Sequence, residues 1–208
     1  MKVLSAQQMR DLEQAAVDNG ATYIKLMEKA GTAAAEALIK YGAESKKVVI
    51  ICGKGNNGGD GYVIGRVLKK YSCKVDIIRL GEPRTTDSKL NAEKAIKLDI
   101  AMVNFPEDKE TSFELIKNAD YIVDAVYGIG FRGALDENTA EIAKFVNTSK
   151  AFVMAVDIPS GVGCDDGSVK GECFKANLTV TFTTLKPAHI LYPSMDYCGK
   201  SDRSHVVL

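Results

Sequence analysis

Three loops of this sequence place oxygen-bearing side chains directly after apolar runs. Asn57 follows one such run through a glycine-rich loop, and Asp124 and Asp157 stand near the ends of two others. In open parallel sheets, ligands bind beyond the carboxyl ends of the strands. A carboxylate at that position is costly to desolvate unless it is paired, hydrogen-bonded or bound to a cation. We therefore predict that these loops meet at one site on one edge of a sheet.

The donor types limit the chemistry of this site. The Asn57 amide, the Asp124 carboxylate and the Ser160 hydroxyl or carbonyl are all oxygen donors, and such a set suits a hard cation. Asp157 then remains as a candidate acid or base. Taken singly, each carboxylate could instead be a loop cap or turn former. It is their shared sheet edge that favours a functional site.

The glycine-rich loop 53–61 predicts anion binding. It follows five apolar residues, 48–52, and precedes a stretch with helical spacing from Tyr62 onward. Glycine allows close backbone approach to a ligand, and a helix N-terminus behind it offers free N–H groups to phosphate. The spacing fits the dinucleotide fingerprint, in which an acidic residue about 20 residues further on binds the ribose. Here that residue is Asp76, but it lies inside an apolar run, and Arg79 is nearer the strand end where the ribose would bind. A loop that merely turns the chain is the alternative.

Several other chemistries are disfavoured. The chain has two histidines, His189 and His205, which we interpret as surface or structural residues, and it lacks a Gly-x-Ser-x-Gly elbow, a Walker lysine and paired metal histidines. Lys plus Arg and Asp plus Glu number 27 each, so no global field favours nucleic acid or an anionic membrane. The five cysteines form no Cys-x-x-Cys motif, which argues against a disulfide framework or zinc site. The N-terminus has no apolar core of signal-peptide type, and no run of apolar residues is long enough to span a membrane, so we expect a soluble, cytoplasmic protein.

The sequence pattern predicts strands and helices that alternate along the chain. Ser5 opens a capping box before a first helix, and a second helix is expected over 22–41. The alternation of strands and helices that follows implies a parallel sheet in one α/β domain over 1–208. We expect strands at 48–52, 74–80, 101–103, 121–126, 151–156 and 178–184, a further strand at 190–192, and helices at 88–98, 112–117 and 137–146.

Four motifs in this order resemble the signatures of the YjeF N-terminal family. They are residues 53–61 (Gly-Lys-Gly-Asn-Asn-Gly-Gly-Asp-Gly), 124–133 (Asp-Ala-Val-Tyr-Gly-Ile-Gly-Phe-Arg-Gly), 156–161 (Val-Asp-Ile-Pro-Ser-Gly) and 184–187 (Thr-Leu-Lys-Pro). The resemblance implies a Rossmann-like three-layer α/β/α sandwich with a mainly parallel sheet. It also implies the activity of the family's enzymes, NAD(P)H-hydrate epimerases, which interconvert the R and S forms of NADHX and NADPHX. An ADP- or ATP-dependent dehydratase then repairs the S form.

Site residues follow from the motif match. One potassium ion per subunit would be bound by Asn57, Asp124 and Ser160, and a homodimer through the alanine-rich N-terminal helices is expected. The hydrated dinucleotide would be contacted by Asn56, Asn57, Gly58, Gly59, Asp60, Gly128, Ile129, Gly130, Phe131, Arg132, Gly133, Ala134 and Asp157.

Our hypothesis for the mechanism gives Asp157 both proton transfers, first as the acid for the leaving hydroxyl and then as the base for returning water. Lys186 reaches either a ligand phosphate or a carboxylate, and Arg79 could accommodate a 2′-phosphate. The ending 200–208 is polar where the family usually has a last strand, and the chain is either stand-alone or an excerpt of a fusion. Two alternatives stay open, namely a nicotinamide-dependent dehydrogenase and a non-catalytic scaffold of the same fold.

Overall fold

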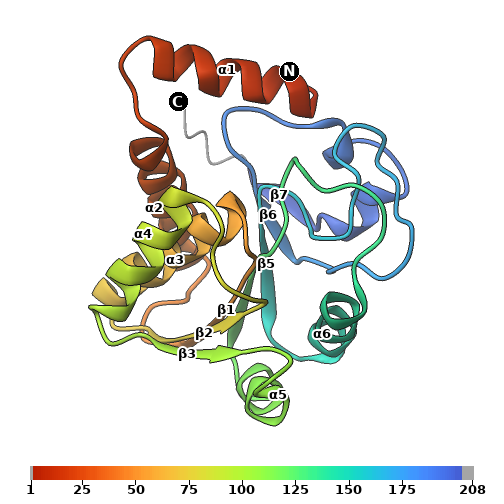
Figure 1. Cartoon of the computed structure of the whole chain (residues 1–208). Helices are drawn as coiled ribbons and strands as arrows, with labels where there is room; N and C mark the ends of the chain where they lie inside the picture. The colour runs from red at the N-terminus through yellow and green to blue at the C-terminus, as the bar shows by residue number, and fades with distance from the viewer. Residues whose placement is uncertain (1, 203–208) are drawn as a thin grey trace.

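One seven-stranded sheet forms the centre of the computed structural model, which describes residues 2–202 (Figure 1). The strands run in the order β3-β2-β1-β4-β5-β6-β7, and every neighbouring pair is parallel. The α/β prediction with a parallel sheet is therefore confirmed. The strands are β1 Lys47–Cys52, β2 Lys74–Arg79, β3 Ala101–Asn104, β4 Tyr121–Ala125, β5 Phe152–Val156, β6 Leu178–Val180 and β7 Lys200–Asp202.

Helices cover both faces of the sheet and produce two apolar cores (Figure 1). Along β1, Val48, Ile50 and Cys52 belong to one core, whereas Val49 and Ile51 belong to the other. This alternation explains why β1 is a continuous apolar run, since a strand buried on both faces has no polar side. The first core packs against α2 Tyr23–Lys40, α3 Asn56–Lys70 and α4 Thr86–Ile96, and the second against α5 Lys109–Lys117 and α6 Glu137–Thr148.

The sheet order reverses between β1 and β4. From β1 the chain moves outward to β2 and β3, and it then returns to place β4 on the other side of β1. The last paired residues of these two central strands are Cys52 and Ala125. In open α/β sheets, ligands usually bind in the crevice at the carboxyl ends of the two strands between which the strand order reverses.

The helix after β1 begins earlier than the sequence spacing predicts. Helix α3 starts at Asn56, with Gly55 as its N-cap, so most of the glycine-rich stretch is helical. Small residues let this first part of α3 lie against its neighbours, because a Cβ on Gly59 would collide with the Met27 side chain and one on Gly61 with Cys52 Sγ. The expected loop is therefore the first turns of a closely packed helix.

The C-terminal part also differs from the prediction. Strand β6 ends at Val180 rather than 184, and residues 190–192 form no strand but join two 3-10 helices, Pro187–His189 and Ser194–Tyr197. The polar residues after Gly199 do form a short last strand, β7, beside β6. The rest of the atypical ending, 203–208 with His205, lies outside the described residues.

The N-terminal helices have different surroundings. Four of the five alanines of α2 are buried in the first core and Ala33 is partly buried against it, so most of this face is used inside the chain. Helix α1, Ala6–Asp18, carries the predicted capping box at Ser5 and lies apart from the main layers (Figure 1). Its first residue is held by a hydrogen bond from the Ala6 N–H to Asp165 Oδ1 at 2.7 Å. Within residues 2–202, no helix has the length and apolar character needed to cross a membrane.

Candidate active site

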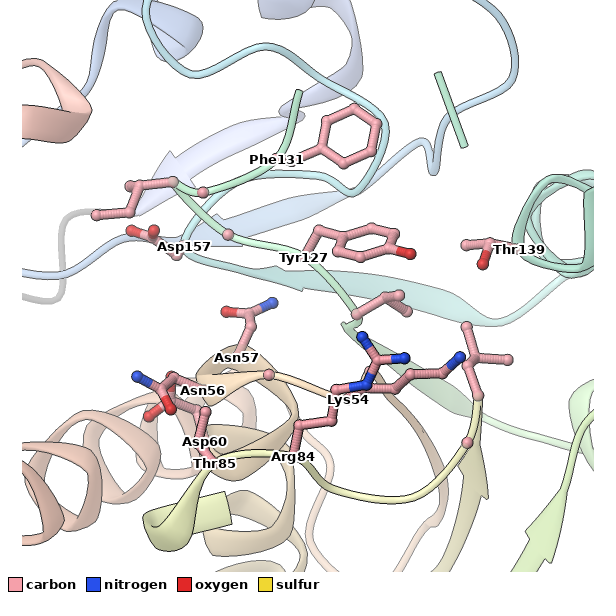
Figure 2. Close-up of a pocket in the computed structure, with 18 of the residues that line it drawn as sticks. Lys54, Asn56, Asn57, Asp60, Arg84, Thr85, Tyr127, Phe131, Thr139 and Asp157 are labelled. Carbon is pink, nitrogen blue, oxygen red and sulfur yellow. The ribbon is translucent and has the colours of Figure 1, made fainter. Parts of the chain in front are cut away.

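A cavity of about 910 Å³ lies at the switch point of the sheet. Its lining comes from the loops after β1, β2, β3 and β4, from Asp157 at the end of β5, and from α1 through Met9 and Glu13. Figure 2 shows Asn56, Asn57 and Asp60 at the start of α3 facing Asp157 across this space. The volume suits a ligand of nucleotide size.

Glycines bring the loop after β1 against the chain that follows β4. A Cβ on Gly53 would collide with the carbonyl of Val126, and one on Gly58 would collide with the carbonyl of Gly53. Gly55 supplies no side chain to cap α3, so first-turn N–H groups of this helix remain available at the cavity. Such groups, at the positive end of a helix dipole, bind phosphate.

Asp157 and Lys186 form a buried ion pair at one end of the cavity. Lys186 Nζ lies 2.6 Å from Asp157 Oδ1 and also donates to Thr181 Oγ1 at 2.7 Å and to the Phe182 carbonyl at 2.9 Å. Burial alone would raise the pKa of Asp157, but the charge and hydrogen bond of Lys186 outweigh it and hold that pKa below its ordinary value. Asp157 is thus a carboxylate with one oxygen fixed by the ammonium group.

The second oxygen of Asp157 faces the loop after β4. Asp157 Oδ2 and Asn57 Oδ1 would each lie 3.2 Å from a Cβ built on Gly128, so Gly128 leaves space between these two side chains. The backbone of Asp157 has a φ of 70°, an uncommon conformation for a residue with a side chain. Backbone held in this region by surrounding structure is a feature of functional sites.

His189 fixes the backbone of Asp157. The Lys186 N–H donates to His189 Nδ1 at 2.9 Å, which leaves Nε2 as the protonated nitrogen, 2.9 Å from the Asp157 carbonyl. Burial lowers the pKa of His189, so the ring is neutral. The sequence-based interpretation of His189 as structural agrees with this position.

Asp124 is fully buried beneath the same loop. The Ser160 N–H donates to Asp124 Oδ2 at 2.7 Å, and the Ser160 hydroxyl donates to Oδ1 at 2.6 Å. The Tyr127 N–H in turn donates to Ser160 Oγ at 2.9 Å. Burial raises the pKa of Asp124 to about 6, although the hydrogen bonds from Ser160 and Val126 act to lower it.

The structure brings two of the three expected cation ligands, Asp124 and Ser160, into direct contact. Within residues 2–202 no three His, Cys, Asp or Glu side chains gather into a metal cluster, so an ion would rest on one carboxylate and neutral oxygen donors. Asn57 Nδ2 is buried without a hydrogen-bond partner, but it is a donor, so only Oδ1 of this amide could contact a cation. Asp124 and Ser160 are in direct contact, and Asn57 faces Gly128, the residue after Tyr127.

A second cavity carboxyl has a pKa shifted in the opposite direction from that of Asp157. Burial, together with the charges of Asp157 and Glu13, raises the pKa of Asp60 well above its ordinary value. Asp60 and Asp157 both line the cavity. Paired carboxyl groups whose pKa values are pushed apart are suited to separate acid and base roles.

The structure brings together most, but not all, of the predicted contact residues. Gly58 and Gly59 pack inside the protein, and Arg132, Gly133 and Ala134 lie beyond the cavity lining within residues 2–202. Those that line the cavity are Asn56, Asn57, Asp60, Gly128, Ile129, Gly130, Phe131 and Asp157.

Sequence reasoning missed several lining residues. Lys186 was left out of the site because its motif allowed either a phosphate or a carboxylate partner, and the structure pairs it with Asp157. Lys54 and Arg84 also line the cavity. Their position directly after β1 and soon after β2 was the available signal. Arg79, which was considered for a ribose phosphate, instead contacts Asn104 and Glu82.

Comparisons with known proteins find similar sequences over most of this chain. The family described as YjeF-related protein N-terminus matches residues 24–188. An NAD(P)H-hydrate epimerase of Limosilactobacillus fermentum is 34% identical over 200 residues, covering 96% of this chain and 94% of that protein. A bifunctional NAD(P)H-hydrate repair enzyme Nnr of Coxiella burnetii is 36% identical over 197 residues, covering 93% of this chain but only 39% of the relative.

A solved structure has the same fold. The crystal structure of yeast ynu0, YNL200c, matches with a TM-score of 0.82 and 25% identity, covering 90% of this chain and 82% of that one. The expected three-layer sandwich is therefore confirmed.

Proposed function

The chain belongs to the YjeF-related N-terminal family, and from this membership and the cavity we propose that it is an NAD(P)H-hydrate epimerase. It would interconvert the R and S forms of NADHX and NADPHX at carbon 6 of the hydrated ring. The observation that carries the proposal is Asp157, a carboxylate fixed through one oxygen by Lys186 while the other faces the cavity.

Epimerisation requires the carbon 6–oxygen bond to break and to form again on the opposite face. The ring nitrogen lone pair assists departure of the hydroxyl, which gains a proton and leaves as water. The resulting iminium-like centre is attacked by water, which loses a proton. No atom or electron is gained or lost overall, so the protein has to supply binding, orientation and proton transfer.

Asp157 is suited to receive the proton of the returning water, because it is ionised and has a free oxygen at the cavity. Microscopic reversibility makes the same group the acid when the hydroxyl leaves from that face. Asp60, with its raised pKa, is the second group able to donate a proton in the same space. This division modifies the expectation that Asp157 alone performs both transfers.

We also propose one potassium ion per subunit, held by Asn57, Asp124 and Ser160. When bound, the ion supplies positive charge that offsets the buried Asp124 carboxylate and positions the loop at Tyr127. Dialysis into potassium-free buffer is expected to weaken dinucleotide binding in calorimetric titration. An affinity unchanged by potassium would remove the ion from the proposal.

The direct test is stereochemical. A defined R/S mixture of NADHX is incubated with the protein, and the ratio is followed by chromatography. The chain is expected to accelerate equilibration, and D157N is expected to lose at least about a hundredfold of that rate while remaining folded. A D157N protein with near-normal rate would exclude Asp157 as the proton-transfer group.

The same assay separates the two alternatives. A nicotinamide-dependent dehydrogenase would change absorbance at 340 nm with a second substrate and leave the R/S ratio untouched. A non-catalytic scaffold would bind ligand without scrambling it. Retention of Asn57, Asp124, Asp157 and Ser160 favours the enzyme.

The proposed partner is an ADP- or ATP-dependent dehydratase that consumes the S form. Relatives named bifunctional NAD(P)H-hydrate repair enzymes support this link. The five cysteines are all buried and unpaired, in keeping with the proposed cytoplasmic location. Since α2 buries most of its alanines, the proposed homodimer would use α1, where Leu12 is exposed, and sedimentation analysis of L12E tests that contact.

A further inference from the structure

Two cationic side chains line the cavity away from the acid–base end. Lys54 directly follows Gly53 in the loop after β1, and Arg84 belongs to the loop after β2. Figure 2 shows both on the side of Tyr127 and Thr139, across the cavity from Asp157. Asp157 and this positive charge therefore occupy different parts of one cavity.

The backbone holds these two loops together. The Arg84 N–H donates to the Lys54 carbonyl at 2.8 Å, and the preceding strands pair in parallel with Cys52 beside Arg79. Gly81, with a φ of 114°, leaves the space through which the Lys54 side chain passes, because a Cβ there would collide with Lys54 Cε. The position of Lys54 thus depends on a glycine in the neighbouring loop.

Neither cation is neutralised by an ion pair among residues 2–202. Glu82, in the same loop as Arg84, pairs with Arg79 instead. Asp136 accepts hydrogen bonds from Thr139 and Tyr127 as the cap of α6. Glu107 also lines the cavity, but it forms no ion pair with either cation. The two charges are therefore free to bind an anion.

The position of this pair indicates which anion. In dinucleotide-binding sheets, an acidic residue near the end of the second strand reads the ribose 2′-hydroxyl, whereas an arginine there accommodates a 2′-phosphate. Here the acidic residue of β2, Asp76, lies in mid-strand opposite Val49, and the strand ends at Arg79, which is already bound. The cavity thus has cations and no ribose-reading carboxylate from β2.

Resting on the proposed function, we propose that Lys54 and Arg84 form a subsite for the 2′-phosphate of the phosphorylated cofactor, so that the chain acts on NADPHX in preference to NADHX. The pair would bind the extra phosphate while the hydrated ring lies toward Asp157. Arginine and lysine both form charge-assisted hydrogen bonds with phosphate.

The test uses NADPH and NADH, which differ only in the 2′-phosphate, as binding probes. Dissociation constants are measured by titration calorimetry for the intact chain, for K54Q/R84Q, and for K70Q/K74Q. The last variant removes two exposed positive charges outside the cavity lining. The intact chain and K70Q/K74Q are expected to bind NADPH at least about tenfold more tightly than NADH, and K54Q/R84Q to lose that ratio.

Two results would overturn the subsite. One is a ratio near one for the intact chain. The other is an equal loss of NADPH and NADH affinity in K54Q/R84Q, which would assign the cations to the shared pyrophosphate. Because neither probe is epimerised, the NADPH/NADH ratio is independent of the R/S assay. A lost ratio in K54Q/R84Q without any R/S scrambling by the intact chain would support the subsite and refute the epimerase.

Discussion

Replacing Lys186 by methionine tests the central ion pair, because it leaves the buried Asp157 carboxylate without its cation. Lys186 is 1% exposed and Asp157 8% exposed, so solvent can replace the lost ammonium group only in part, from the cavity side. Breaking one side of a buried pair costs about 3–5 kcal/mol. For a chain of this size, we expect the melting temperature of K186M to fall by roughly 6–20 °C.

The assay is a double-mutant cycle in urea with K186M, D157N and the double variant. D157N/K186M removes both charges, so it is expected to be more stable than K186M, with an interaction energy of about 2–3 kcal/mol. K70M, at an exposed lysine of α3, is the control and is expected to change stability by less than about 0.5 kcal/mol. A K186M stability within 1 kcal/mol of the intact chain, or additive single effects, would refute the reasoning.

The pH dependence of stability supplies an independent check, because the pKa of Asp157 should shift in opposite directions in the intact chain and in K186M. In the intact chain the lowered pKa of Asp157 makes its contribution present above its ordinary value of 3.8 and lost as pH falls through the folded value. In K186M burial remains and the lysine charge is gone, so the pKa of Asp157 is expected to be raised. Stability of K186M should then fall as pH rises through that raised value. The destabilisation should therefore be smaller at pH 5 than at pH 7.

Two further perturbations follow from the same structure. G58A is expected to lower the free energy of unfolding in urea by at least about 2–3 kcal/mol, because its Cβ would collide with the Gly53 carbonyl. G55A, with open space around it, is the control and should change the free energy of unfolding by less than about 1 kcal/mol. Equal effects of the two substitutions would contradict the packing argument. The pKa of His189 is lowered in the folded chain, so below the ordinary histidine pKa of 6.5 the unfolded chain binds more protons at this residue than the folded chain does. The contribution of His189 to stability should therefore fall as pH decreases below 6.5, by at most about 1.4 kcal/mol per pH unit. H189Q should remove this contribution between pH 5 and 6.5, where Asp124, whose pKa is raised to about 6, adds a slope of opposite sign in both proteins. The measured quantity is therefore the difference in slope between the intact chain and H189Q, and equal slopes would assign the proton uptake to another group.

Much of the fold was accessible from the sequence because its local patterns agree with its tertiary environment. The run 48–52 is apolar on both faces because β1 is buried on both faces, and the Ser5 capping box forms as its residue types predict. The start of α3 was misplaced because glycines at 58, 59 and 61 weaken any helical prediction. They are helical here because only glycine fits between α3 and its neighbours.

The order of residues along the chain was enough to predict the available chemistry, namely glycine-marked strand ends with oxygen donors, and a motif set that assigns the family. The reason is that such residue types are required locally, by backbone approach and by desolvation. The contact of Lys186 with Asp157, and the position of Lys54 beside the loop of Arg84, became known only from the folded chain. These contacts join residues about 30 positions apart, and strand order and loop geometry, rather than any local pattern, fix which side chains meet.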